Sequence, residues 1–69
     1  MVIEIGKTYR TRDGSTFKAI NFTGNPGTYA VYGKDQFGCP TWRSIKGRFT
    51  IHPHYLDIVS EVVDADRNA

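Results

Sequence analysis

Residues that interrupt regular structure recur about every ten positions along this chain of 69 residues, and no segment between them keeps the 3.6-residue apolar spacing of an amphipathic helix. The segments between these glycines, asparagines and prolines are instead short and rich in Thr, Tyr, Phe, Val and Ile. This pattern predicts an all-β meander of five or six short antiparallel strands. So short a chain covers both its core and its sheet edges by curling, so we expect a small SH3-like partial barrel. An open sheet that forms a homodimer through an edge strand is the alternative.

The clearest local signal is a β-hairpin over residues 9–20. Asp13-Gly14 can supply the positive φ angles of a two-residue primed turn, and β-compatible residues flank it on both sides. Alternation along the first strand places Tyr9 and Thr11 on one face, and Arg10 and Arg12 on the other. One face of the hairpin is therefore expected to enter the core, and the other to meet water or an anionic partner.

The remaining elements are placed by the breaker residues between them. A bulge is expected at 19–21, because the apolar residues Phe17 and Ala19 lie out of phase with Ile20 and Phe22. It would bring both sets inward. The other expected elements are a short edge strand at 2–5, a loop at 23–27, strands at 28–32, 39–45 and 56–63, and a turn at 33–38. We therefore predict one domain over residues 1–63 and a frayed polar tail over 64–69.

Charge is distributed unevenly along the chain, although the net charge is only +2. Residues 1–49 contain eight Lys and Arg against three Asp and Glu, whereas residues 50–69 contain one against four. The N-terminus lacks the pattern of a secretory signal, and no apolar run of 18 residues occurs. A cytoplasmic protein without a membrane partner is the expectation. The single cysteine, Cys39, excludes an intrachain disulfide, and we expect it to be a buried or half-buried small apolar residue.

Basic and aromatic side chains form the candidate binding surface. Lys and Arg on a small barrel can neutralise phosphates or meet carboxylates, and exposed rings can stack on bases. The residues assigned to this surface are Arg10, Arg12, Lys18, Tyr32, Trp42, Arg43, Lys46 and Arg48. Two plainer interpretations stay open: the cations form an ordinary solvated sheet face, and Trp42, Tyr29, Tyr32 and Phe37 form an aromatic core.

Catalytic and metal-binding patterns are weak in this chain. His52, His54 and Asp57 are spaced loosely like metal ligands, but the two imidazoles flank a proline and no second pair of ligands accompanies them. No recognisable nucleophile motif surrounds Cys39. We therefore expect no enzyme activity, no catalytic residues, no metal and no cofactor, and interpret the histidines as turn residues.

Three short segments resemble a loose group of small, mostly uncharacterised phage and prophage proteins. Those proteins combine a YRTRDG hairpin, a W…DGRY segment and a YDLV end. The matching stretches here are Gly6 to Gly14, Trp42 with Gly47-Arg48-Phe49, and Tyr55-Leu56-Asp57-Ile58-Val59. This chain departs from the pattern in having no acidic residue before Gly47, and in having Leu56 between Tyr55 and Asp57.

The resemblance implies an accessory protein of a phage or mobile element, made in the bacterial cytoplasm and acting by binding a host macromolecule. Together with the basic and aromatic residues, it favours a non-enzymatic protein that binds a bacterial host protein or protein complex. A small β-barrel that binds nucleic acid through the same cations is the alternative.

Overall fold

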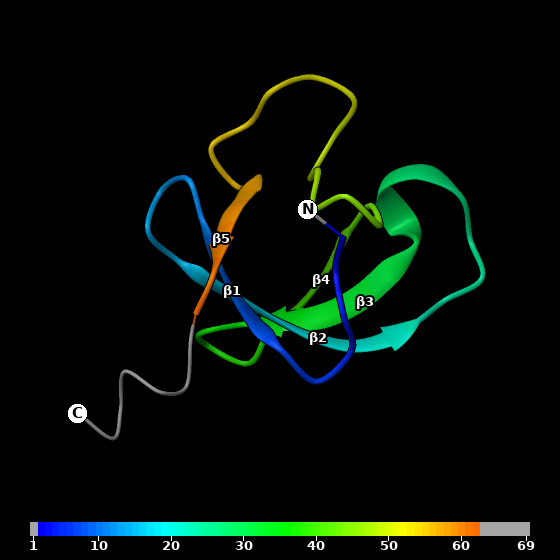
Figure 1. Cartoon of the computed structure of the whole chain (residues 1–69), viewed down its shortest axis with the longest axis horizontal. Helices are drawn as coiled ribbons and strands as arrows, with labels where there is room; N and C mark the ends of the chain where they lie inside the picture. The colour runs from blue at the N-terminus through cyan, green and yellow to red at the C-terminus, as the bar shows by residue number, and fades with distance from the viewer. Residues whose placement is uncertain (1, 63–69) are drawn as a thin grey trace.

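A computed structural model describes residues 2–62 of the chain, and it is an all-β fold of five antiparallel strands in one sheet (Figure 1). The strand order is β4-β3-β2-β1-β5, so the chain forms a meander whose last strand returns beside the first. The elements are β1 (Thr8–Thr11), β2 (Thr16–Phe22), the 3₁₀ turn η1 (Gly27–Tyr29), β3 (Val31–Asp35), β4 (Pro40–Arg43) and β5 (Ile58–Glu61). The predicted small SH3-like partial barrel is confirmed, with five strands.

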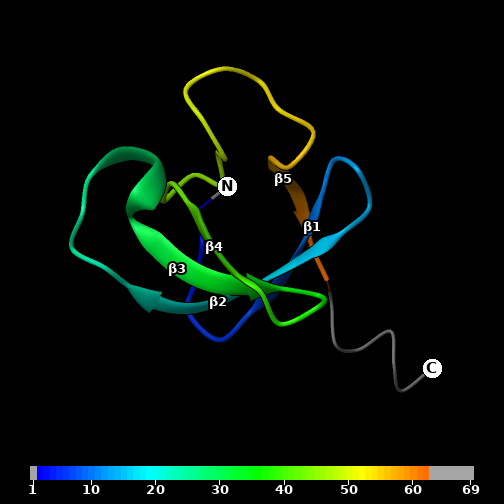
Figure 2. The same ribbon diagram turned by 180° about the vertical axis from the view of Figure 1, so that it is seen from behind.

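The sheet curls strongly, and the long segment between β4 and β5 arches over one end of it (Figures 1 and 2). Backbone hydrogen bonds bring the two sheet edges together through this segment. The amide of Ile58 donates to Gly47 O at 2.9 Å, and the amide of Ile3 donates to Ile45 O at 2.8 Å. The turn after β4 therefore fills much of the gap between the edge strands, which satisfies backbone groups that an open edge would leave to solvent.

The concave side of the sheet holds a narrow core. Tyr9, Phe17 and Val31 are almost fully buried, as the alternation along β1, β2 and β3 requires. The other buried apolar residues are Ile3, Ala19, Ala30 and Ile58. The predicted strand at 2–5 does not form, but Ile3 enters the core and the Glu4 amide donates to Tyr9 Oη at 2.7 Å.

Three turns share one hydrogen-bond pattern. In the first, the amide of Gly14 donates to Thr11 O and the amide of Thr11 donates to Ser15 O. The same pattern recurs at 35–39 and at 44–48, and each time a glycine with a φ between +80° and +89° holds the fourth position. These are three-residue loops that end in a glycine bulge. The predicted two-residue turn at Asp13-Gly14 is therefore wrong, because no non-glycine residue among the described positions has a positive φ.

Several predicted boundaries shift. The run at 28–32 is divided between η1 and β3, and β3 continues through Gly33 to Asp35, where a turn was expected. The bulge in β2 is confirmed by a register shift between Ala19 and Asn21. It does not bring Ile20 inward, however, and Ile20 remains 39% exposed. Cys39 is exposed instead of buried.

Two predicted elements concern the C-terminal part of the chain. The predicted closing strand at 56–63 is observed only as Ile58–Glu61. The predicted tail at 64–69, and residue 63 of the predicted domain, lie outside the described residues. Within residues 2–62, the structure contains no helix with the length and apolar character needed to span a membrane.

Candidate binding surface

The convex side of the sheet, which we call the outer face, carries the candidate surface. It consists of the side chains that alternate with the core residues along four adjacent strands. They are Thr8 and Arg10 of β1, Thr16 and Lys18 of β2, Tyr32 and Lys34 of β3, and Pro40 and Trp42 of β4. Four of the eight predicted site residues, Arg10, Lys18, Tyr32 and Trp42, are thus brought onto one continuous face.

Two lysines lie directly opposite each other at the centre of this face. Lys18 of β2 pairs with Lys34 of β3 in the antiparallel register, and both side chains are exposed. Like charges at directly opposed sheet positions repel each other. Neither lysine forms an ion pair with any carboxylate among residues 2–62. The pair is therefore a cationic site that the rest of the described chain does not neutralise.

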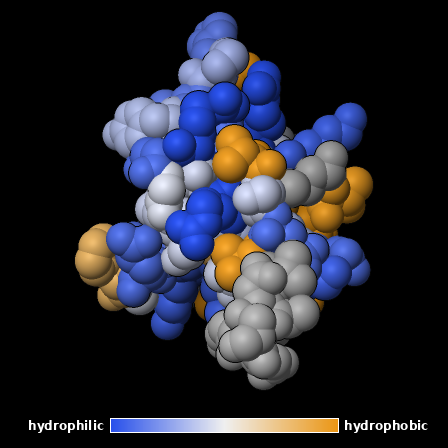
Figure 3. Space-filling model, turned by 60° about the vertical axis from the view of Figure 1, so that its left-hand side comes forward, coloured by the Kyte–Doolittle hydropathy of each residue, from blue (hydrophilic) through white to orange (hydrophobic). Residues whose placement is uncertain are grey.

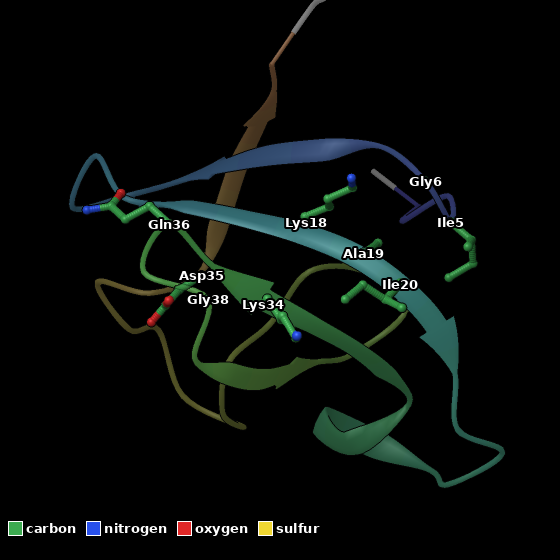
Figure 4. Close-up of a pocket in the computed structure, with 9 residues that line it drawn as sticks. All are labelled: Ile5, Gly6, Lys18, Ala19, Ile20, Lys34, Asp35, Gln36 and Gly38. Atoms are coloured by element: carbon green, nitrogen blue, oxygen red, sulfur yellow. The ribbon is translucent and has the colours of Figure 1, made fainter.

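A groove of about 570 Å³ runs beside these lysines (Figure 4). Ile5 and Ile20 lie at one end of it, Gln36 lies at the other, and the two lysine side chains extend between them. Ile20 is available to the groove because the bulge in β2 leaves it on the outside. The groove thus combines an apolar end with two ammonium groups, and the carboxylate of Asp35 also lines it.

An aromatic cluster borders the lysines on the side of β4. The ring of Trp42 lies 5.7 Å from that of its cross-strand partner Tyr32 and 6.4 Å from that of Tyr29, measured between centroids. Trp42 is 37% exposed and Tyr29 is 63% exposed. Phe37 is exposed as well, so the interpretation of these rings as the aromatic core is wrong. Tyr9 and Phe17 are the core rings instead.

Arg43 does not belong to this surface, so the prediction that it lies on the exposed face with Trp42 is wrong. It pairs with Val31 on the inner side of β4 and is only 2% exposed. The register explains the error, because Arg43 and Trp42 are sequence neighbours and neighbouring strand residues point to opposite faces. Both could not lie on one surface.

The buried guanidinium of Arg43 has a dense set of contacts. It lies between the rings of Phe17 and Phe49, 4.9 Å from each centroid. Nε donates to Leu56 O, and Nη1 donates to Thr41 Oγ1 and Trp42 O. Burial lowers the pKa of this guanidinium, and the charges of Asp57, Asp13 and Asp35 act in the opposite direction. Arg43 is therefore a structural residue of the core.

Arg12 and Arg48 lie at a different place, beside the buried carboxylate of Asp57. Each guanidinium is 3.9 Å from Asp57 Oδ2. Asp57 also accepts hydrogen bonds from the backbone amides of Phe49 and His54, at 2.9 and 3.0 Å. Burial acts to raise the pKa of Asp57, but these amides and the two arginines outweigh it and hold the pKa below the ordinary value of 3.8. Asp57 therefore organises the segment between β4 and β5.

The same segment accounts for the histidines. His54 Nδ1 accepts the amide of Leu56 at 3.0 Å, and its ring stacks on Tyr55 with centroids 4.2 Å apart. No group of three or more His, Cys, Asp or Glu able to hold a metal occurs in the described part of the chain.

Lys46, the last predicted cation, lies in the turn at 44–48 beside Arg48 and away from the outer-face lysines.

Sequence reasoning missed Lys34, because the segment 33–38 was taken as a turn. The alternation along the strand from Tyr32 could have identified it, because it places Lys34 on the same face once β3 extends to Asp35.

Apolar side chains also remain at the surface, and Figure 3 shows hydrophobic patches separated by hydrophilic surface. Single exposed apolar residues are normal, but the groove and the aromatic cluster gather several of them on one face.

No protein-family model, no curated protein and no solved structure matches this chain. The candidate surface is therefore defined by its own geometry.

Proposed function

We propose that this chain is a non-enzymatic binding protein whose outer face recognises an acidic, partly apolar segment of another protein. The observation that carries the proposal is the unneutralised pair Lys18 and Lys34. Two ammonium groups held opposite each other cost the free protein stability. Carboxylates of a partner would relieve this repulsion, so the pair favours the bound state electrostatically.

The groove beside the pair defines what else the partner must supply. Ile5 and Ile20 provide an apolar wall next to the ammonium groups. An apolar side chain of the partner would be buried there, while flanking Asp or Glu residues meet Lys18 and Lys34. Trp42 and Tyr32 extend the contact area, and aromatic residues of this kind commonly anchor protein interfaces. The recognition unit is thus an apolar residue flanked by carboxylates.

A protein partner is favoured over nucleic acid by the distribution of the cations. Among the cations of residues 2–62, only Arg10, Lys18 and Lys34 share the outer face, because Arg43 is buried and Arg12 and Arg48 lie beside Asp57. Affinity for nucleic acid rises with the number of phosphates that are neutralised. Two lysines that line the groove, with Arg10 further along the same face, suit a short acidic protein segment better.

Nucleic acid remains the second candidate because of the exposed rings. Trp42, Tyr32 and Tyr29 lie together, and the Tyr32–Trp42 pair is two positions along the strands from Lys34. Rings beside cations can stack successive bases of a single strand. This candidate predicts binding that does not depend on sequence and that weakens steeply with salt.

The proposed biological setting follows from the phage resemblance. An accessory protein of a phage would meet its partner in the bacterial cytoplasm, so bacterial lysate is the appropriate source of partners. We propose a host protein or protein complex as the target.

Capture from lysate with matched variants tests the proposal. Lys34→Glu reverses one charge of the pair, and Lys46→Glu makes the same change in the turn at 44–48. We expect a specific partner that is retained by the wild type and by Lys46→Glu, and lost with Lys34→Glu and with Trp42→Ala. Capture that is indifferent to Lys34 and Trp42 would contradict the proposal.

Fluorescence anisotropy with labelled single-stranded and duplex DNA at about 50 mM salt separates the two candidates. The protein-binding proposal expects no saturable binding to either. Saturable binding that weakens with salt, and that is lost with Lys34→Glu and Trp42→Ala, would favour nucleic acid instead.

A further inference from the structure

A second cavity lies at one end of the barrel, and it shares Asp35 and Gln36 with the lining of the outer-face groove. Its volume is about 200 Å³, below the roughly 300–1,000 Å³ of pockets for drug-sized ligands. Two of the glycine turns border it, contributing Asp13 and Asp35, and the buried Arg43 lines it together with Leu56. Ser15, Thr16, Gln36, Phe37 and Thr41 complete the lining. The cavity is therefore small, polar and charged.

The guanidinium of Arg43 has donors left for a ligand. Its three hydrogen bonds use Nε and Nη1, and Nη2 donates to none of the residues 2–62. No fully buried side-chain nitrogen or oxygen in this part of the chain lacks a partner, so Nη2 reaches accessible space. The rings of Phe17 and Phe49 hold the guanidinium in place. A buried, fixed cationic donor thus reaches the cavity.

Each of the two aspartates has one carboxylate oxygen that accepts hydrogen bonds within its turn and a second oxygen that accepts none from the described residues. Asp13 Oδ1 accepts from Ser15 and Thr11, and Asp35 Oδ1 accepts the amides of Phe37 and Cys39. The Oδ2 atoms accept no hydrogen bond from the described residues. The hydroxyl of Ser15 first, then that of Thr11, lowers the pKa of Asp13 to about 2. Asp13 is thus a carboxylate at neutral pH, held by its turn with one free oxygen.

We propose that this cavity binds a small zwitterion of the size of a free amino acid. Arg43 Nη2 would donate to the ligand carboxylate, and Asp13 and Asp35 would accept from its ammonium group. A simple anion would meet the two carboxylates and a simple cation would meet the guanidinium, so only a ligand with both charges satisfies all three groups. This site uses none of the outer-face lysines, so its test does not depend on the proposed protein-binding function, although Asp35 and Gln36 line both the cavity and the groove.

NMR titration of the ¹⁵N-labelled full chain with glycine, L-alanine and L-threonine tests the inference. We expect saturable shifts of the Arg43 Nε–H signal and of the Ser15, Gln36 and Thr41 amides, with affinity in the range of about 1 mM that suits so small a ligand. Acetate and methylammonium, which carry one charge each, should bind at least about tenfold more weakly. Shifts that stay linear up to about 50 mM for all three amino acids, or acetate that binds as well as glycine, would overturn it.

Two isosteric variants test the carboxylates without removing the turns. Asp35→Asn and Asp13→Asn keep the Oδ1 acceptor but remove the charge at Oδ2. Each should weaken glycine binding by roughly tenfold to a hundredfold, and either variant suffices if the other does not fold. Lys46→Glu should leave glycine affinity within about twofold, because Lys46 lies in the turn at 44–48 and does not line this cavity. Unchanged affinity in a folded aspartate variant, or a large loss in Lys46→Glu, would contradict the inference.

Discussion

Arg43 donates a hydrogen bond of 2.9 Å from Nε to the carbonyl oxygen of Leu56. This bond joins the last residue of β4 to the segment that leads into β5. Together with the contacts of the guanidinium to the rings of Phe17 and Phe49, it connects the two edge strands of the sheet across the core. Arg43, although arginine is usually a surface residue, thus stabilises the barrel from within its core.

Arg43→Ala should destabilise the fold by about 2–4 kcal/mol, because it removes three hydrogen bonds and leaves a void between two rings. Urea denaturation followed by tryptophan fluorescence measures the loss. Arg10→Ala is the matched control, since Arg10 is exposed and donates one hydrogen bond, to Gly14 O. Its effect should stay below about 1 kcal/mol. Equal losses in the two variants would refute the structural role of Arg43.

Asp57 should give the protein an acid-sensitive component of stability. Its pKa is lower in the folded state than the ordinary value of 3.8, so its contribution is present above that value and is lost as pH falls through the folded pKa. Asp57→Asn should lower stability at pH 7 by about 1–3 kcal/mol, because it disturbs the bonds to Phe49 and His54.

The pH dependence of unfolding separates this effect from a simple loss of stability. Between pH 6 and pH 2, the free energy of unfolding of Asp57→Asn should fall less steeply than that of the wild type. The free energy of unfolding of Asp57→Asn should still decrease somewhat at low pH, because Asp13, with a pKa of about 2, still titrates. Parallel curves for the two proteins would show that Asp57 does not contribute to the acid sensitivity.

Gly33→Ala should destabilise the protein by about 3 kcal/mol or more, or prevent folding. A Cβ at Gly33 would lie 2.2 Å from Lys18 O and 2.6 Å from Cε1 of Phe17. Neither the hydrogen-bonded backbone of β2 nor the buried ring of Phe17 can move aside to make room. Gly24→Ala is the control, because nothing lies within 4 Å of its Cβ position and only its φ of +80° opposes the change. Its cost should be about 1–2 kcal/mol. Thermal unfolding by circular dichroism compares them.

Lys34→Glu should raise stability, and under the proposed function it should also abolish partner binding. Replacing the like-charged cross-strand pair with a pair of opposite charges should stabilise the sheet by about 0.2–1 kcal/mol. The gain should shrink at high salt, since exposed charges are screened. Denaturation at low and high salt checks this, and a destabilised variant would argue against repulsion between Lys18 and Lys34.

Gly38 tests the shared turn pattern. Its φ of +80° is tolerated by Asn much better than by a β-branched residue, and nothing lies within 4 Å of the position that a Cβ would occupy. Gly38→Asn should therefore cost about 1 kcal/mol less than Gly38→Val in thermal unfolding. Similar costs would indicate that the turn does not depend on this conformation.

Several features of the fold could be read from local residue patterns. Tyr9, Thr11 and Phe17 are buried where the alternation placed them, and the bulge near Ala19 was visible as a break in phase. The type of the turn at Asp13-Gly14 could not be read from the sequence, because an Asp-Gly pair suits both a two-residue and a three-residue loop. Half of the eight predicted surface residues share one face, namely Arg10, Lys18, Tyr32 and Trp42, whereas Arg12, Arg43, Lys46 and Arg48 do not lie on it.

By itself, the sequence determined the all-β class and the places where the chain turns, because glycine, proline and alternating side chains act through local sterics and a period of two. Only the tertiary structure decided which cations are exposed. Arg43 is buried because its register with Val31 directs it inward, where Leu56 O and two rings receive it. Lys34 faces outward opposite Lys18 because β3 extends further than its residues suggest. Register depends on pairing between distant segments, and a local pattern does not specify that pairing.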